Sequence, residues 1–191
     1  MINGIQNIQK NIRLFLTAVI QSGDTVLDAT AGRGRDTQFL AERVGPRGTV
    51  HAFDIQAEAL ADTRKLLREQ ELERIVQLHR RDHAALAQVV RAPLRAAMFN
   101  LGYLPGGDQA IVTQAATTVE ALRAATGLLL PGGIVSLTVY RGHPGALEEE
   151  AAVRTFIHGL PESFSVLEGR YPALPEHTPY WILLQKKEGG E

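Results

Sequence analysis

Short β-prone runs alternate with amphipathic helical patterns along most of the chain, and this alternation constrains the fold more than any other feature. The expected strands cover residues 25–30, 49–54, 75–79, 95–100 and 134–140. Apolar residues at helical spacing follow them, from about 36, over 56–71 and 84–90, and around 112–122 and 153–160. Strands joined through helices form a parallel sheet with helices on both faces. The sequence therefore predicts an α/β domain.

The two ends of the chain extend this pattern. Apolar residues at steps of three and four predict a helix over 3–20 that packs on the domain. Residues 164–168 and 180–185 read as two strands with no helix between them, which predicts an antiparallel hairpin at one edge. We expect a single domain, 1–191, with a Rossmann-like seven-stranded, mostly parallel sheet, helices on both faces and this C-terminal hairpin. The tail, 186–191, is expected to be disordered.

The composition excludes several classes of protein. The 191 residues contain no cysteine, which rules out disulfides, cysteine-type zinc sites, iron–sulfur clusters and cysteine nucleophiles. The net charge is −1, whereas a domain that holds duplex nucleic acid mainly through phosphates is usually strongly basic. No apolar run has the length of a membrane span and no signal peptide opens the chain, so we expect a cytoplasmic protein with no membrane contact, as a monomer or homodimer.

A glycine turn follows the first expected strand, in Asp28-Ala29-Thr30-Ala31-Gly32-Arg33-Gly34. Glycine lets the backbone turn sharply and lets a ligand approach without meeting a Cβ atom. The dinucleotide fingerprint has Gly or Ala three residues after the second glycine, where this chain has Thr37. Asp28 would repel a pyrophosphate but suits a ligand with an ammonium and a sulfonium group. The turn therefore favours S-adenosylmethionine over NAD, with an ordinary strand-to-helix turn as the alternative.

Further carboxylates follow strands at the same edge of the sheet. Asp54 ends the second strand and can accept hydrogen bonds from both ribose hydroxyls of either cofactor. Asp82 follows the third strand, where it can meet the adenine amino group and can equally cap the short helix after it. His79 and His83 straddle a strand end instead of sharing one helical turn, so we expect no metal site.

The loop after the fourth strand, Asn100-Leu101-Gly102-Tyr103, is expected to face the reactive methyl group. Ligands of open α/β sheets bind at the carboxyl ends of the strands, near the switch in strand order. The loop resembles the Asn-Pro-Pro-Tyr loop of methyltransferases that act on amines, with Leu101 and Gly102 in place of the prolines. There the Asn oxygen accepts a hydrogen bond from the target nitrogen and the ring packs on the substrate. The alternative is a glycine-rich turn in which Asn100 satisfies local backbone.

A longer set of motifs resembles a family of small bacterial methyltransferases that was long labelled as rRNA methylases. It consists of Asp28-Ala29-Thr30-Ala31-Gly32, Asp36-Thr37, Phe53-Asp54-Ile55-Gln56, Phe99-Asn100-Leu101-Gly102-Tyr103-Leu104-Pro105-Gly106-Gly107-Asp108 and Gly142-His143-Pro144-Gly145. Members are associated with the wobble uridine of tRNA, converting 5-aminomethyl-2-thiouridine to its methylaminomethyl form. The resemblance runs from about Asp24 to the last strand. The family commonly has Gly-Asn-Gly-His-Asp in the glycine turn, and this chain differs there at Arg33 and Arg35.

The resemblance implies S-adenosylmethionine as cofactor, the tRNA anticodon loop as partner, and Asn100 and Tyr103 as the catalytic residues that hold the amine. The cofactor-binding residues predicted from the turn, the strand ends and the resemblance are Asp28, Gly32, Gly34, Asp36, Thr37, Asp54, Gln56, Asp82, His83 and Asn100.

The substrate side is expected to carry a small basic rim. Arg33, Arg35 and Arg141 are predicted to contact phosphates, and Tyr103 to stack on the base. His143 is predicted to accept a proton, while a turn that caps the next helix is the alternative for Arg141 and His143.

Other functions stay open at this point. The same chemistry fits a base amine of rRNA or a small-molecule amine as acceptor. An NAD-dependent oxidoreductase is disfavoured by Thr37 and by the lack of a Tyr-x-x-x-Lys pair after the fourth strand. A binding module without catalysis is disfavoured because no structural need explains both Asn100 and Tyr103.

Overall fold

A computed structural model of the chain describes residues 7–108, 110–175 and 177–189. Its centre is a sheet of seven strands in the order β3-β2-β1-β4-β5-β7-β6. The strands are β1 (Thr25–Asp28), β2 (Thr49–Asp54), β3 (Val76–Arg80), β4 (Leu94–Leu101), β5 (Leu129–Val139), β6 (Phe164–Gly169) and β7 (Tyr180–Lys186). Pairing from β3 to β5 is parallel, and β7 is antiparallel to both neighbours. The predicted Rossmann-like fold with a C-terminal antiparallel hairpin is confirmed.

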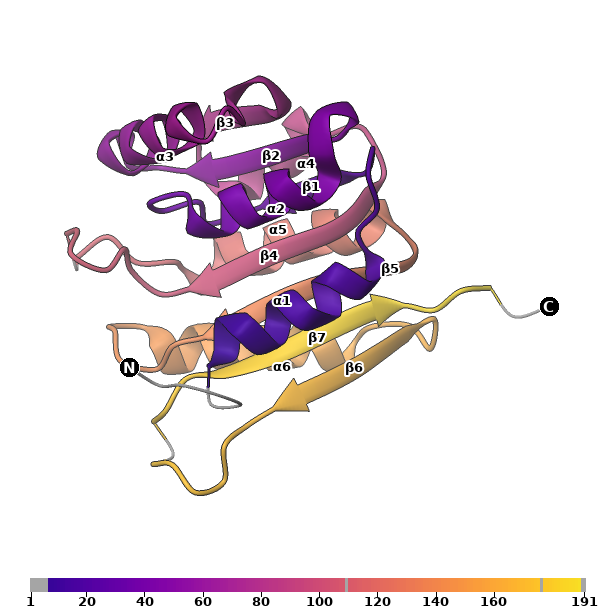
Figure 1. Cartoon of the computed structure of the whole chain (residues 1–191). Helices are drawn as coiled ribbons and strands as arrows, with labels where there is room; N and C mark the ends of the chain where they lie inside the picture. Colours follow the sequence, from indigo (N-terminus) through magenta and orange to yellow (C-terminus); the bar gives the residue numbers. More distant parts are fainter. Residues whose placement is uncertain (1–6, 109, 176, 190–191) are drawn as a thin grey trace.

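Helices cover both faces of this sheet (Figure 1). One face carries α1 (Ile8–Val19), α2 (Arg35–Val44) and α3 (Ala57–Glu69), and the other carries α4 (Leu86–Val89), α5 (Ala115–Leu128) and α6 (Ala146–His158). Three short 3-10 helices, η1 (Gly45–Arg47), η2 (Glu73–Ile75) and η3 (His83–Ala85), lie in the connections. No helix of the described ranges is both long and apolar enough to cross a membrane.

The period-two pattern of the strands divides the apolar core between the faces. Val26 of β1 packs with α1 and α2, whereas Leu27 packs with α5 and α6. Both side chains are fully buried, as expected for central strands covered on both faces. Because the core fixes β1 and β4 side by side, the loops that follow these strands are held next to each other.

The N-terminal helix is shorter than predicted. Asn7 caps it, its side chain accepting a 3.0 Å hydrogen bond from the Lys10 nitrogen, so α1 begins at Ile8. Residues 3–6 of the predicted helix lie outside the described residues. Ile12 and Leu16 are buried against the sheet, so α1 lies across β4, β5 and β7 (Figure 1).

The disordered tail was predicted to begin too early. Lys186 is the last residue of β7, and its Nζ donates a 2.8 Å hydrogen bond to the Leu129 carbonyl. The Lys187 nitrogen donates to the Ser163 carbonyl at 2.8 Å, because strand pairing with β6 continues to this point. Residues 190–191 of the predicted tail lie outside the described residues.

Candidate active site

A cavity of about 1180 Å³ opens at the carboxyl ends of the parallel strands. Its wall includes the glycine turn after β1, the end of β2, the segment after β3, the end of β4 and the first residues of α1. Predicted site residues that line it are Gly32, Arg33, Arg35, Asp36, Asp54, Gln56, Asp82, His83, Asn100, Tyr103 and Arg141. The fold thus brings together most of the residues that the sequence selected, at the edge where ligands of open α/β sheets bind.

The glycine turn is held from below by the end of β2. The Gly32 nitrogen donates a 2.9 Å hydrogen bond to Asp54 Oδ2, while Asp54 Oδ1 accepts one of 2.8 Å from the Gln56 nitrogen. Gly34 has a φ of 81°, and a Cβ atom there would lie 2.9 Å from the Thr63 side chain. Glycine is therefore required at Gly34 by both conformation and space.

Three predicted cofactor residues lie below the cavity wall instead of in it. Asp28 and Thr37 are fully buried, and the Thr37 hydroxyl donates a 2.6 Å hydrogen bond to Asp28 Oδ2. Burial, with a further contribution from Asp36, raises the pKa of Asp28 to about 7. Gly34 also lies outside the lining. That Asp28 meets a cationic ligand stays a prediction, and in this structure its carboxyl group ties the start of α2 to the end of β1.

Asp82 and His83 follow β3 as predicted. Asp82 caps η3, its side chain accepting a 2.8 Å hydrogen bond from the Ala84 nitrogen, and it still lines the cavity. His83 is almost fully buried, and burial lowers its pKa. His79 contacts His51 instead, with 3.1 Å between Nε2 of His79 and Nδ1 of His51. His79 and His83 therefore do not share a site. Within the described parts of the chain no group of three or more His, Cys, Asp or Glu is placed to hold a metal.

The Asn100 side chain is held on both sides. Its Nδ2 donates a 2.9 Å hydrogen bond to Asp36 Oδ2, and its Oδ1 accepts one of 2.7 Å from Gln9 Nε2. Asp36 in turn pairs with Arg13 at 2.8 Å. Because a carboxylate only accepts hydrogen bonds, Asp36 fixes which end of the Asn100 amide is nitrogen and which is oxygen.

Tyr103 lies at the cavity wall and is 38% exposed, so its ring is available to a ligand. The backbone before it is fixed by Thr113, whose hydroxyl accepts a 2.8 Å hydrogen bond from the Gly102 nitrogen and donates one of 2.8 Å to Glu149. Glu149, which is buried on α6, therefore supports the Asn100–Tyr103 loop through Thr113. This loop has Leu101 and Gly102 in place of the two prolines of the Asn-Pro-Pro-Tyr loop.

The predicted basic rim is only partly at the surface. Arg33 and Arg35 are exposed at the cavity mouth, with Arg33 3.8 Å from Asp62. Arg141 also lines the cavity, but its guanidinium forms a bidentate pair with Glu150, with both N···O distances 2.7 Å. The phosphate contact of Arg141 stays a prediction, and in this structure its fork is matched to a carboxylate.

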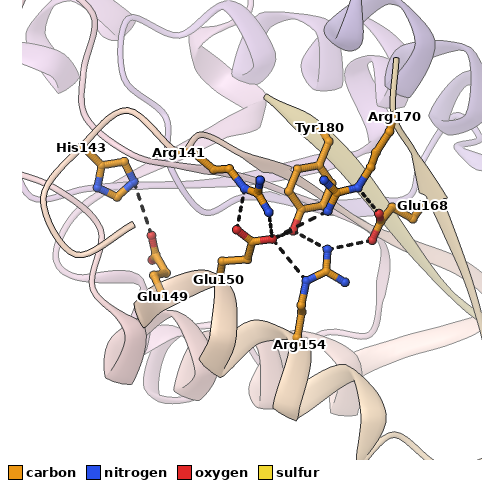
Figure 2. A network of polar contacts seen from close by, with 8 residues as sticks. All are labelled: Arg141, His143, Glu149, Glu150, Arg154, Glu168, Arg170 and Tyr180. Carbon is orange, nitrogen blue, oxygen red and sulfur yellow. Dashed lines mark hydrogen bonds and ion pairs between the residues drawn. The ribbon is translucent and has the colours of Figure 1, made fainter. Parts of the chain in front are cut away.

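His143 does not line the cavity, and its ring is directed at Glu149 (Figure 2). Its side chain is only 1% exposed and its Nε2 lies 3.9 Å from Glu149. Its role as a proton acceptor for substrate stays a prediction, and in this structure the ring is buried against α6. Residues 141–145 form the turn before α6, whose N-cap is Gly145 without a side-chain capping hydrogen bond.

Glu150 is the centre of the network in Figure 2. Arg141, Arg154 and the Tyr180 hydroxyl all donate hydrogen bonds to it. Burial alone would raise the pKa of Glu150, but these hydrogen bonds outweigh burial and lower it to about 2. Arg170 stacks on the Tyr180 ring at 3.8 Å from its centroid and pairs with Glu168. The network joins the β5–α6 turn to α6, β6 and β7, and Arg141 is its member at the cavity wall.

Sequence reasoning missed Gln9, Arg13 and Tyr140, which also line the cavity. Gln9 and Arg13 are four residues apart on α1 and so share one face of that helix. Two polar residues at this spacing, next to the face of α1 that packs on the sheet, were the signal in the sequence that could have pointed to them. Which residues they contact could not be predicted from the sequence, because it depends on where α1 crosses β4.

Comparisons with known proteins agree with this geometry. The family model described as "Putative rRNA methylase" matches residues 50–185. A chloroplastic tRNA (mnm(5)s(2)U34)-methyltransferase of Arabidopsis thaliana is 44% identical over 155 residues, which are 76% of this chain and 57% of that protein. The chain thus spans little more than half the length of this curated relative.

Two solved structures are similar over nearly their whole length. A "putative rRNA-methylase" of Clostridium thermocellum is 37% identical, with a TM-score of 0.92 over 96% of this chain and 100% of that one. A "putative methyltransferase" of Streptococcus mutans, solved in complex with SAH, is 32% identical, with a TM-score of 0.86 over 96% of this chain and 99% of that one. The chain therefore belongs to the family described as "Putative rRNA methylase", within the S-adenosylmethionine-dependent methyltransferases.

Proposed function

We propose that this protein transfers a methyl group from S-adenosylmethionine to the aminomethyl nitrogen of a tRNA wobble uridine, 5-aminomethyl-2-thiouridine. The observation that carries the proposal is the Asn100 amide, fixed by Asp36 and Gln9 at the wall of the large cavity. The name of the Arabidopsis relative supports the choice of acceptor.

The residues at the strand ends fit the cofactor. Asp54 uses one acceptor site of each oxygen for backbone nitrogens, and a carboxylate has about four such sites. Two sites are left for ribose hydroxyls. A Cβ atom at Gly32 would lie only 3.1 Å from Leu104 Cδ1, so the glycine turn packs closely against the loop after β4. Asp82 and Gln56 lie along the same wall, where an adenine ring would meet them. When bound, S-adenosylmethionine supplies an electrophilic methyl group on a sulfonium.

The chain's own task at the acceptor is to orient a neutral amine. Asn100 Oδ1 can accept one N–H of a primary amine, which turns the nitrogen lone pair in a fixed direction. The side chain cannot take a proton itself, so its contribution is placement. The acceptor reacts as a neutral amine that has lost its proton to solvent before transfer, and Asp36, paired with Arg13 and with its side chain 11% exposed, serves to orient Asn100.

The mouth of the cavity suits a single nucleotide taken out of an RNA loop. Tyr103 offers a half-exposed ring for stacking, and Arg33 and Arg35 offer charge for neighbouring phosphates. Arg33 Nη2 lies 3.4 Å from the Gly106 carbonyl, which keeps this charge at the loop that carries Tyr103. Only a few phosphates need contact, in keeping with a net charge of −1.

The experiment is a methyl-transfer assay with labelled cofactor and separate RNA classes. We expect label in tRNA that carries 5-aminomethyl-2-thiouridine and none in the same tRNA without the aminomethyl group. Transfer should weaken with salt, but with a shallow dependence. Label in rRNA with none in tRNA would overturn the choice of acceptor and favour the activity that the family description names.

A further inference from the structure

We propose that Gln9 of α1 is a positioning residue for Asn100. It holds the amide so that Oδ1 keeps one acceptor site for the incoming amine. The inference rests on the proposed function for the identity of that amine, but the hydrogen-bond arrangement itself is independent of it. Residue 9 lies outside the region matched by the family model, which begins at residue 50.

The orientation of the Asn100 amide follows from charge. Arg13 Nη2 lies 2.8 Å from one oxygen of Asp36, and Asn100 Nδ2 donates to the other oxygen at 2.9 Å. A carboxylate in this pair accepts and does not donate, so Asn100 Nδ2 must face Asp36. Oδ1 then points to the opposite side, which is where Gln9 lies.

The orientation of Gln9 follows in turn. Its Nε2 donates to Asn100 Oδ1 at 2.7 Å and to Thr138 Oγ1 at 3.2 Å, while Thr138 pairs with Asn100 across β4 and β5. Tyr140 also forms a side-chain hydrogen bond with Gln9, so Asn100, Thr138 and Tyr140 together hold the glutamine amide in place.

Two anchors on one amide restrict its rotation. The last torsion of an asparagine side chain is broad in the absence of partners, so Asp36 alone would leave Oδ1 free to move about that contact. Gln9 occupies one acceptor site of Oδ1, and the oxygen has two. The second site remains at the cavity wall, aimed by a rigid arrangement before substrate arrives.

The helix is built to keep Gln9 still. Asn7 caps α1 through the Lys10 nitrogen, which stabilises the first turn that carries Gln9. Arg13 is one turn further along and holds Asp36. One face of α1 therefore supports both ends of the Asn100 amide. Gln9 contacts Oδ1 directly, and Arg13 supports Nδ2 through Asp36.

The test compares Gln9→Ala and Gln9→Glu with Gln88→Ala, an exposed glutamine on α4, as the matched control. We expect Gln9→Ala to lower kcat about tenfold to a hundredfold, since small misplacements are costly. KM for the amine and Kd for SAH should change less than threefold, and Gln88→Ala should match the wild type. Unchanged kcat in Gln9→Ala would overturn the proposal, as would an equal loss of SAH binding.

Gln9→Glu gives a readout that a purely structural role would not move. An ionised glutamate has no proton to donate to Oδ1, whereas a protonated one has. The charged or titratable groups around this position are Arg13, Asp36 and Tyr140. Burial raises the pKa of Tyr140, and the hydrogen bond between Tyr140 and Gln9 opposes this shift. The kcat of Gln9→Glu relative to wild type should rise severalfold as the pH falls from 8 to 5.5, while that of Gln9→Ala stays level. A level ratio for both variants would contradict the role.

A measurement without substrate separates this inference from the proposed function. Solvent exchange of the Asn100 side-chain NH₂ protons, measured by NMR, should increase at least fivefold in Gln9→Ala and stay unchanged in Gln88→Ala. Unchanged exchange in Gln9→Ala would overturn the positioning role whatever the acceptor is. A wild-type protein that is inactive on aminomethyl tRNA would overturn the acceptor alone, and the exchange result would still decide the role of Gln9.

Discussion

Asp54 and Gly32 are joined by a 2.9 Å hydrogen bond from the Gly32 nitrogen to the Asp54 carboxylate, so the end of β2 shapes the turn after β1. The same carboxylate is expected to bind the cofactor ribose. Hydrogen bonds to charged groups contribute about 1.5–3 kcal/mol, so Asp54→Ala should weaken SAH binding roughly tenfold to a hundredfold. Calorimetry checks this, with Glu162→Ala, at an exposed position between α6 and β6, as the control. Tight binding of NAD and none of SAH would contradict the cofactor assignment.

Asn100→Ala separates acceptor chemistry from cofactor binding. The change removes the oxygen that orients the amine, so kcat should fall about a hundredfold or more while Kd for SAH changes less than threefold. Asn100→Asp is the sharper variant, because it keeps an acceptor but sets a second carboxylate against Asp36, only 2.9 Å away in the present pairing. It should also lose most of the turnover. Wild-type kcat for Asn100→Ala at saturating substrate would show that the loop works differently.

Gly34→Ala tests the geometry of the turn. At a φ of 81° an alanine costs about 1–2 kcal/mol, and its Cβ would also contact Thr63 at 2.9 Å. We expect a lower Tm and weaker SAH binding. Gly127→Ala on α5, where a Cβ would meet nothing within 4 Å, is the matched control and should leave binding unchanged. Equal behaviour of the two variants would mean that the turn is not under this constraint.

Asp28 predicts a specific pH dependence of stability. Its ordinary pKa is 3.8, and burial raises it to about 7 in the folded protein. Between these values the folded state holds a proton that the unfolded chain has released, so the contribution of Asp28 to stability falls as the pH rises, and it levels off above about 7. The slope for one proton is at most about 1.4 kcal/mol per pH unit.

Denaturant titrations of wild type and Asp28→Asn from pH 5 to 8 measure this contribution. The stability of the wild type minus that of the variant should decrease with pH up to about 7 and then stay level. A difference that does not change with pH would show that Asp28 is already ionised in the fold at pH 5. Other titrating groups, such as His83, are shared by both proteins and cancel in the comparison.

Local patterns predicted the fold and the strand-end residues, and they failed where partners come from distant elements. The alternation of strands and helices sufficed for Asp54, Asp82 and Asn100, because their place depends only on where a strand ends. Glu150 lies only nine residues after Arg141, but Tyr180 of β7 donates to the same carboxylate, and this distant partner could not be read from local spacing. Gln9 was missed because 91 residues separate it from Asn100.

The acceptor is the central claim, and mass spectrometry of nucleosides tests it most directly. Purified protein is incubated with S-adenosylmethionine and tRNA that carries 5-aminomethyl-2-thiouridine at the wobble position, and the tRNA is then digested to nucleosides. The account predicts loss of the aminomethyl nucleoside and an equal gain of 5-methylaminomethyl-2-thiouridine, with Asn100→Ala giving neither. An unchanged wobble nucleoside, with the methyl group found on another base or on rRNA, would contradict it.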